Sequence, residues 1–237
     1  IGRVLLNAFN AWEYGWESDR AELKENSLKV FDSYLKNGFT EAGFFKEFVN
    51  LDRNFEEPVH SIRRQSEGIY AMLHFLAYEK EQGRRHSEWE QRMKKMLDMF
   101  MQLQNQDGSF PRKFRDDFSI VDKSGGSPSA TLPLVMGYKY FKDKRYLDSA
   151  KKTADYLENE LISKADYFSS TLDANCEDKE ASLYAATATY YLALITKGEE
   201  HKHYADLTKK AAYFALSWYY LWDVPFAPGQ MLGDIGL

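Results

Sequence analysis

The chain has 237 residues, 44% of them hydrophobic and 16% aromatic, which is enough apolar surface to bury a continuous core and excludes a disordered chain. Its 36 acidic residues outnumber 31 basic ones, and the formal charge of −5 argues against a nucleic-acid partner, because nucleic-acid-binding proteins neutralise phosphates with a dense basic surface. It has no apolar run of the roughly eighteen residues that a membrane span needs, and its single cysteine belongs to no Cys/His cluster with zinc-ligand spacing, so we expect no membrane span, no metal and no cofactor.

Residues 4–48 have the pattern of a helix pair followed by an aromatic loop. Apolar residues recur at helical spacing over 4–16 and again over 21–38, and phenylalanines crowd the segment 41–48. The low number of glycines and prolines in the chain favours long helices over short strands. We therefore expect an inner helix, an outer helix and a connecting loop.

The same unit recurs further along the chain. An aromatic residue followed five positions later by a Lys-Lys pair opens three amphipathic outer helices, and these anchors, Trp89, Tyr146 and Tyr204, lie 57 and 58 residues apart. Segments that are apolar around more of their circumference precede the anchors, at 68–83, 129–141 and 180–198. Such segments are typical of helices flanked on several sides, so we interpret them as inner helices.

This repeat, with a period of about 57 residues, predicts an all-α fold of inner and outer helix pairs, an α/α toroid. We expect residues 1–237 to form one toroid domain. A closed ring of six pairs needs on the order of a hundred more residues at this period. We therefore expect an incomplete (α/α)6 barrel, cut from a longer chain.

A loop at the end of the outer helix that begins near Trp89 carries a distinctive run, made of Gln104, Asp107, Gly108, Ser109 and Phe110. It resembles the Q-x-x-D-G-S-F/W box of the (α/α)-toroid superfamily, which includes glycoside hydrolases, unsaturated glucuronyl hydrolases, uronyl epimerases, terpene cyclases and protein prenyltransferase β subunits. The box has a structural explanation, since Gly108 can adopt a positive φ and Asp107 can accept backbone hydrogen bonds. The other interpretation makes Asp107 a catalytic acid.

The carbohydrate-active branch of this superfamily is the better match. Terpene cyclases use Asp-rich clusters, and the nearest pair here, Asp116 and Asp117, lacks a third carboxylate; prenyltransferases need an Asp, Cys and His zinc site, and Cys176 has no histidine nearby. The resemblance implies an oligosaccharide or polysaccharide substrate, bound where inner helices begin. If the chain degrades glycans, a periplasmic or extracellular location is favoured.

Polar residues crowd the segment that leads into the inner helix 68–83, namely His60, Arg63, Arg64, Gln65 and Glu67. In the functional interpretation the arginines pair with a uronate or sulfate group, His60 and Gln65 also contact substrate, and Glu67 or His60 transfers a proton. In the structural interpretation Ser66 caps the helix and Glu67 favours its dipole.

A second acidic segment precedes the inner helix 180–198 and contains Asp173, Glu177, Asp178 and Glu180. Glycoside hydrolysis needs two carboxyl groups, one protonated and one ionised, and this loop is a source of the second. We take Asp173, Glu177 and Asp178 as catalytic candidates. Acidic residues are also ordinary in a first helical turn, so the structural alternative stays open.

Aromatic residues near helix ends are candidates for sugar-stacking platforms, and Trp12, Trp16 and Trp222 are the three selected. The mixed-charge segment 113–129, with its Gly-Gly pair, is expected to be a mobile lid or a solvated connector.

Three functions remain open. The leading hypothesis is a glycoside hydrolase acting on oligosaccharides or, given the arginines, on uronate-containing glycans. The second is a non-catalytic helical scaffold that binds a glycan or a protein on its concave face, and the third is an isoprenoid-processing toroid. Because one fold hosts many functions, the choice depends on the residues of the site.

Overall fold

The computed structural model describes residues 2–47, 49–50, 55–56, 58–123, 125, 127–167, 177, 179–219, 225–227 and 229–231. Within these residues the chain forms eight α-helices: α1 (Gly2–Glu17), α2 (Ala21–Asn37), α3 (Ile62–Glu81), α4 (Ser87–Leu103), α5 (Ser127–Phe141), α6 (Lys144–Tyr156), α7 (Lys179–Ile195) and α8 (Gly198–Leu216). A π-helical turn, Leu157–Ile162, continues α6. The predicted all-α architecture is confirmed.

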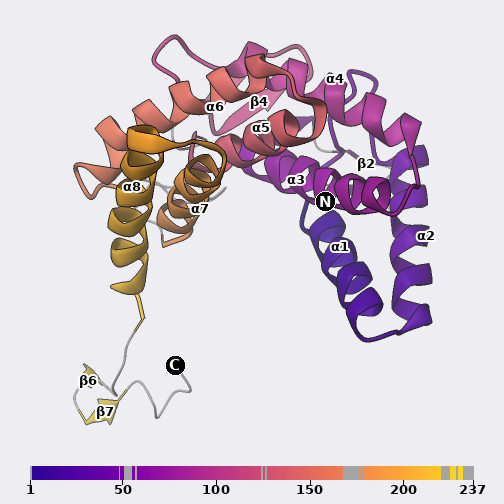
Figure 1. Cartoon of the computed structure of the whole chain (residues 1–237), viewed down its shortest axis with the longest axis horizontal. Helices are drawn as coiled ribbons and strands as arrows, with labels where there is room; N and C mark the ends of the chain where they lie inside the picture. Colours follow the sequence, from indigo (N-terminus) through magenta and orange to yellow (C-terminus); the bar gives the residue numbers. More distant parts are fainter. Residues whose placement is uncertain are drawn as a thin grey trace.

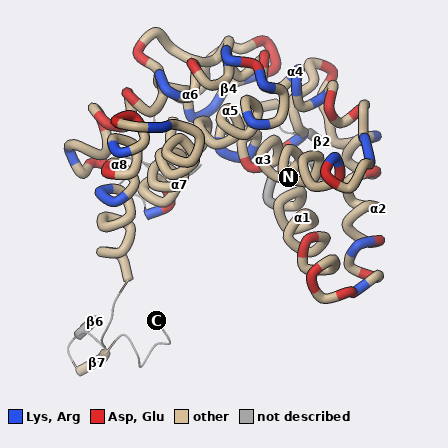
Figure 2. The backbone as a smooth tube through the Cα atoms, in the orientation of Figure 1, with Lys and Arg blue, Asp and Glu red and all other residues tan. Residues whose placement is uncertain are grey.

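The helices form an arc of four antiparallel pairs (Figure 1). The odd-numbered helices pack against one another in the order α1, α3, α5, α7 and line the inner side, while α2, α4, α6 and α8 each pack on the outside of their partner. This is the predicted toroid arrangement of inner and outer helices. Charged residues of both signs are interspersed along the outer helices and loops (Figure 2).

The burial pattern explains the two layers. Every residue of α5 from 127 to 137 is buried, as the sequence predicts for a helix flanked on several sides. The outer helix α4 buries one stripe instead, and its anchor Trp89 is in that stripe together with Met93, Met96 and Phe100. The anchors Tyr146 and Tyr204 are buried in the same way. One continuous hydrophobic core runs from Leu5 to Ala211.

The Q-x-x-D-G-S-F box is a joint between two outer helices. Gln104 donates hydrogen bonds to the carbonyl oxygen of Ser149 at 2.9 Å and to Oγ1 of Thr153 at 2.8 Å, both on α6. Gly108 has φ +91°, and a Cβ there would lie 2.2 Å from the carbonyl oxygen of Lys152. A glycine is required at this position both by its backbone conformation and by the close approach of α6.

Helix α3 begins earlier than predicted. The sequence predicts an inner helix from Gly68 with Ser66 as its cap, but α3 starts at Ile62 and its N-cap is Ser61, whose hydroxyl accepts from the backbone N–H of Arg64 at 3.4 Å. Because the run 63–67 contains no apolar residue, its sequence predicts a loop. It is helical and mostly buried because other segments of the chain supply its hydrogen-bond partners.

Short strands occupy segments that the sequence predicts to be loops. β3 (Val59–Ser61), β4 (Lys113–Arg115) and β5 (Ile120–Asp122) form a three-stranded antiparallel sheet, with β4 in the middle. The segment expected to be a lid or a connector is therefore a β-hairpin over 113–122, attached to the start of α3 through β3. Two smaller ribbons pair β1 (Val49–Asn50) with β2 (Phe55–Glu56), and β6 (Pro225–Ala227) with β7 (Gln230–Met231).

None of the helices in the described ranges combines the length and the apolar character that crossing a bilayer demands.

Candidate functional site

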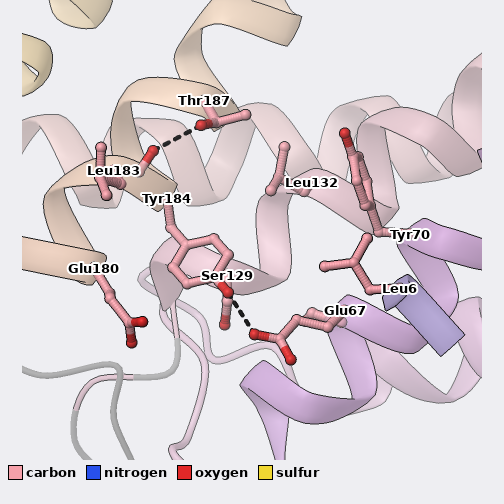
Figure 3. A pocket seen from close by; sticks show the side chains of 10 residues that line it. Leu6, Glu67, Tyr70, Ser129, Leu132, Glu180, Leu183, Tyr184 and Thr187 are labelled. Atoms are coloured by element: carbon pink, nitrogen blue, oxygen red, sulfur yellow. Dashed lines mark hydrogen bonds between the residues drawn. The ribbon is translucent and has the colours of Figure 1, made fainter. Parts of the chain in front are cut away.

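The N-terminal halves of the four inner helices converge on one cavity of about 250 Å³ (Figure 3), which we call the N-terminal cavity. Its walls combine leucine side chains with hydroxyl and carboxyl groups. The lining residues are Leu6 of α1; Ser66, Glu67 and Tyr70 of α3; Ser129 and Leu132 of α5; and Glu180, Leu183, Tyr184 and Thr187 of α7. It occupies the position at which the sequence predicts a substrate, where the inner helices begin.

Glu67 is the most enclosed carboxylate of this cavity, with 6% of the residue exposed. Its Oε1 accepts a 2.5 Å hydrogen bond from the hydroxyl of Tyr184 and a 3.1 Å hydrogen bond from Nε of Arg63. Its Oε2 is buried, and no donor among the described residues reaches it. One oxygen is thus held in place by the protein while the other keeps its full accepting capacity.

Arg63 lies between two carboxylates. Besides Glu67, its guanidinium forms an ion pair with Glu180 and lies 5.6 Å from the ring centroid of Tyr184. Burial alone lowers the pKa of Arg63, but the neighbouring Tyr184, Glu180 and Glu67 together outweigh it and raise the pKa above its ordinary value. Arg63 is therefore a permanent cation whose donors are directed at protein carboxylates.

Two tyrosines complete the polar wall. Burial is the main cause that raises the pKa of Tyr184 and of Tyr70, and the carboxylate of Glu67 adds to it for Tyr184. Both phenols stay protonated in the physiological range and act as hydrogen-bond donors. The hydroxyl of Tyr70 lies 3.0 Å from that of Tyr191, which ties α3 to α7.

The other polar residues predicted before α3 lie outside the cavity lining. Gln65 is completely buried and bonds to the backbone of Phe45, accepting from its N–H at 2.9 Å and donating to its carbonyl at 2.8 Å. It has no exposed atom with which to bind a substrate, so that prediction is corrected. Arg64 contacts the buried Glu47 at 3.5 Å. These two residues fasten the aromatic loop to α3.

His60 belongs to the hairpin contact. Its Nε2 lies 2.7 Å from Oδ1 of Asp116, and its ring packs between Phe44 and Phe114. Only 1% of the residue is exposed. His60 therefore joins β3 to the turn after β4, and it does not line the N-terminal cavity.

The two predicted tryptophan platforms that the structure describes, Trp12 and Trp16, lie away from the cavity. Trp12 is 1% exposed and packs edge-on against Phe75 and Tyr78, so its ring has no open face for a sugar and the stacking prediction is corrected. Trp16 is 41% exposed, but it sits in the last turn of α1, roughly 15 Å along the helix from Leu6, beside Lys24 and Arg84. Trp222 lies outside the described residues.

The two remaining acidic candidates that the structure describes, Asp107 and Glu177, lie apart from the cavity. Asp107 is exposed at the end of α4, and its hydrogen bonds from the hydroxyl and backbone N–H of Ser109 lower its pKa. Glu177 accepts a 3.0 Å hydrogen bond from the backbone N–H of Tyr167, and burial raises its pKa. Neither lines the cavity. Asp173 and Asp178 lie outside the described residues.

The structure adds cavity residues that the sequence analysis did not select, chiefly Glu180, Tyr184 and Thr187. A signal for them exists in their spacing of three and four residues, which puts them on one face of α7. Among the described residues, no group of three or more His, Cys, Asp or Glu side chains is arranged to hold a metal ion.

No protein-family model matches the chain. Its fold is similar to those of an unsaturated glucuronyl hydrolase from Bacillus sp. GL1, responsible for glycosaminoglycan degradation (TM-score 0.69, 13% identity, covering 88% of this chain and 60% of that one), and a D-mannose isomerase (0.67, 14%, 90% and 59%). It is equally similar to a cellobiose 2-epimerase from Bacillus thermoamylovorans (0.67, 13%, 97% and 65%). The chain thus spans between 59% and 65% of the length of these proteins. At such identities the likeness establishes the α/α-toroid fold.

Proposed function

We propose that this chain is a carbohydrate-active enzyme, or the larger part of one, and that its sugar site is the N-terminal cavity. The observation that carries the proposal is the pair of carboxylates, Glu67 and Glu180, held on either side of Arg63 in a cavity bordered by tyrosines and leucines. Tyrosine rings and leucines suit the C–H faces of a sugar, and hydroxyl and carboxyl groups suit its hydroxyls. Proteins of similar fold act on sugars, according to their names.

Glycoside hydrolysis is the reaction that we favour. It uses two carboxyl groups, one to protonate the leaving oxygen and one to activate water or attack the sugar carbon. We assign Glu67 to one of these roles, since its Oε1 is fixed by Tyr184 and Arg63 while no donor among the described residues reaches Oε2. Glu180 is the nearest described candidate for the other role, and Asp173 and Asp178 remain predicted candidates.

Epimerisation is the second candidate, and one feature favours it. Of the two cavity carboxylates, Glu67 is buried, whereas Glu180 has 39% of its side chain exposed. Proton abstraction beside a carbonyl needs one well-placed base, with a donor to stabilise the oxygen. Tyr70 can supply that donor when its hydroxyl accepts from Tyr191, whereas the Tyr184 hydroxyl already donates to Glu67. Two of the similar structures are an isomerase and an epimerase by name.

The test is an incubation of the protein in D2O with a panel of neutral and uronate-bearing oligosaccharides, followed by NMR. Hydrolysis produces new reducing-end signals, whereas epimerisation exchanges the proton at the reacting carbon for deuterium. We expect turnover to fall by about 100-fold or more in Glu67→Gln, the size of a general acid–base contribution. Asp173→Asn, Asp178→Asn and Glu180→Gln identify the second carboxylate.

Glu25→Gln is the matched control, because Glu25 is exposed on the outer helix α2. It should keep wild-type turnover. If the wild-type protein binds oligosaccharides but transforms none of the panel, the scaffold function replaces the enzyme. If Glu67→Gln and Glu25→Gln are equally active, Glu67 has no catalytic part.

A further inference from the structure

A second cavity, of about 570 Å³, lies between the C-terminal halves of α1, α3 and α5. We call it the C-terminal cavity. It adjoins the N-terminal cavity along α3, since Glu67 and Tyr70 line the first and His74, Tyr78 and Glu81 line the second. Spacings of three and four residues place all of them on one helix face.

The two cavities also meet through side-chain contact. The rings of Tyr70 and His74 pack edge to face, with centroids 4.4 Å apart. On α5, Leu132 lines the first cavity and Met136, one turn later, the second. From Glu67 to His74 the rise along α3 is roughly 10 Å, so one elongated ligand is able to reach both.

The C-terminal cavity is bordered by more cations than anions. Lys80 of α3, Lys139 of α5 and Lys142, just past α5, line it together with two carboxylates, Glu13 and Glu81. None of the three lysines forms a salt bridge with a described residue, whereas lysines of the outer helices such as Lys151 do. Lys80 and Lys139 lie over tyrosine rings instead, at 4.8 Å from Tyr140 and 5.7 Å from Tyr191.

Lysines are common near helix C-termini, where they complement the helix dipole, and α3 and α5 both end here. That explanation does not account for His74. Its Nε2 is buried, and no described residue offers it a hydrogen bond. Burial, and then the charge of Lys139, lower the pKa of His74 to about 4. The imidazole is therefore neutral at pH 7, and the positive charge of Lys139 favours this neutral form.

We propose that the C-terminal cavity is an anion-binding subsite that takes the carboxylate of an acidic sugar unit, with Lys139 and Lys80 as its cationic partners. His74 Nε2 hydrogen-bonds a hydroxyl of the same unit. That the ligand is a glycan rests on the proposed function, whereas the carboxylate preference rests on the charges of this cavity. The assignment also gives a uronate a binding place other than Arg63, whose donors already bind Glu67 and Glu180.

The test is calorimetric binding of glucuronate and of glucose to the whole chain at low ionic strength, repeated with a uronate-bearing disaccharide. Charge-assisted hydrogen bonds to a lysine favour glucuronate by about tenfold or more. We expect this preference to disappear in Lys139→Gln and to weaken with added salt. A disaccharide that binds more tightly than glucuronate indicates a glycan rather than a free acid.

Lys29→Gln is the control, because Lys29 is an exposed residue of the outer helix α2. It should keep the preference, and circular dichroism should show each variant folded. Equal affinity for glucuronate and glucose overturns the proposal, as does a preference that survives in a Lys80→Gln, Lys139→Gln double variant. The outcome is independent of turnover: an inactive protein that still prefers glucuronate refutes the enzyme proposal and leaves the anion subsite standing.

Discussion

The hydroxyl of Tyr184 donates a 2.5 Å hydrogen bond to the carboxylate of Glu67, although 117 positions separate them in the sequence. The bond connects the second turns of α3 and α7, two inner helices that both pack against α5. Figure 3 shows it as a dashed line that ends on Glu67. Arg63 reinforces it by contacting Glu67 at 3.1 Å. The orientation of Glu67 is therefore set jointly by its own helix and by a distant one.

Removal of the Tyr184 hydroxyl should destabilise the fold. Tyr184→Phe keeps the ring but deprives the buried Glu67 of a donor, which costs about 1 to 3 kcal/mol. Denaturant unfolding measures the loss. Tyr190→Phe, at a position 51% exposed on the same helix, should unfold like the wild type. Equal stability of the two variants contradicts a stabilising bond.

Loss of Arg63 should lower the free energy of unfolding by more than loss of the Tyr184 hydroxyl does. Arg63→Met leaves Glu67 without its cation in a place where both side chains are under 10% exposed, and breaking such a buried pair costs about 3 to 5 kcal/mol. Adding Glu67→Gln removes the stranded charge and should restore part of the stability. Lys164→Met, which breaks an exposed pair with Glu160, should cost about 1 kcal/mol or less. An unfolding free energy unchanged by Arg63→Met argues against the bridging role.

Two glycines with positive φ give a matched comparison. Gly83→Ala places a methyl group in open space at φ +76°, so only the backbone is strained, at a cost of about 1 to 2 kcal/mol. Gly108→Ala has the same backbone strain and also drives its Cβ to 2.2 Å from the Lys152 carbonyl, so its cost should exceed the first by about 1 kcal/mol or more. Thermal melting of the two variants decides the order. If Gly108→Ala lowers the melting temperature by less than Gly83→Ala does, the close contact between the box and α6 is refuted.

Acid should destabilise the protein through His74. Its pKa is about 4 in the folded chain, below the ordinary value of about 6.5, because of burial and Lys139. The unfolded chain therefore binds the extra proton first, and stability falls as the pH drops from about 6.5 to about 4, by up to about 3 kcal/mol.

His74→Leu removes this titration. Unfolding free energies at pH 8 and at pH 4.5 should therefore differ less in the variant than in the wild type. Glu13 of α1 and Lys139 of α5 line the same cavity. The lower of the two pH values lies between the pKa of His74 in the folded chain, about 4, and its ordinary value of about 6.5. If the unfolding free energy of the variant falls between pH 8 and pH 4.5 by as much as that of the wild type, His74 is not buried and neutral in the folded protein.

The helix repeat could be predicted because the spacing of apolar residues within each short segment indicates it. In α6, for example, Tyr146, Ala150, Thr153 and Ala154 fall on one face and are buried, as their spacing predicts. The glycine of the box was also interpretable in advance, because few residues tolerate a positive φ.

What the sequence could not reveal depends on partners far along the chain. The polar run 63–67 is helical because the backbone of Phe45 bonds to Gln65 and because Glu180 pairs with Arg63. Trp12 resembled a surface platform because it is near an end of the inner helix, yet α3 covers it with Phe75 and Tyr78. Glu67 lines the N-terminal cavity, and its catalytic role stays a prediction. Tyr184 and Thr187 of α7 line the same cavity, but in the sequence they lie among apolar residues.

The N-terminal cavity takes side chains from α1, α3, α5 and α7, and this has a consequence for local opening of the arc. In tandem arrays each unit packs mainly on its neighbours, so terminal units open more readily than central ones. A ligand that touches all four inner helices binds only when all four are formed, and it adds its binding free energy to each. Amide hydrogen exchange should then slow together in α1 and in α7, at the two ends of the arc, which makes the molecule act as one cooperative unit whenever the cavity is filled.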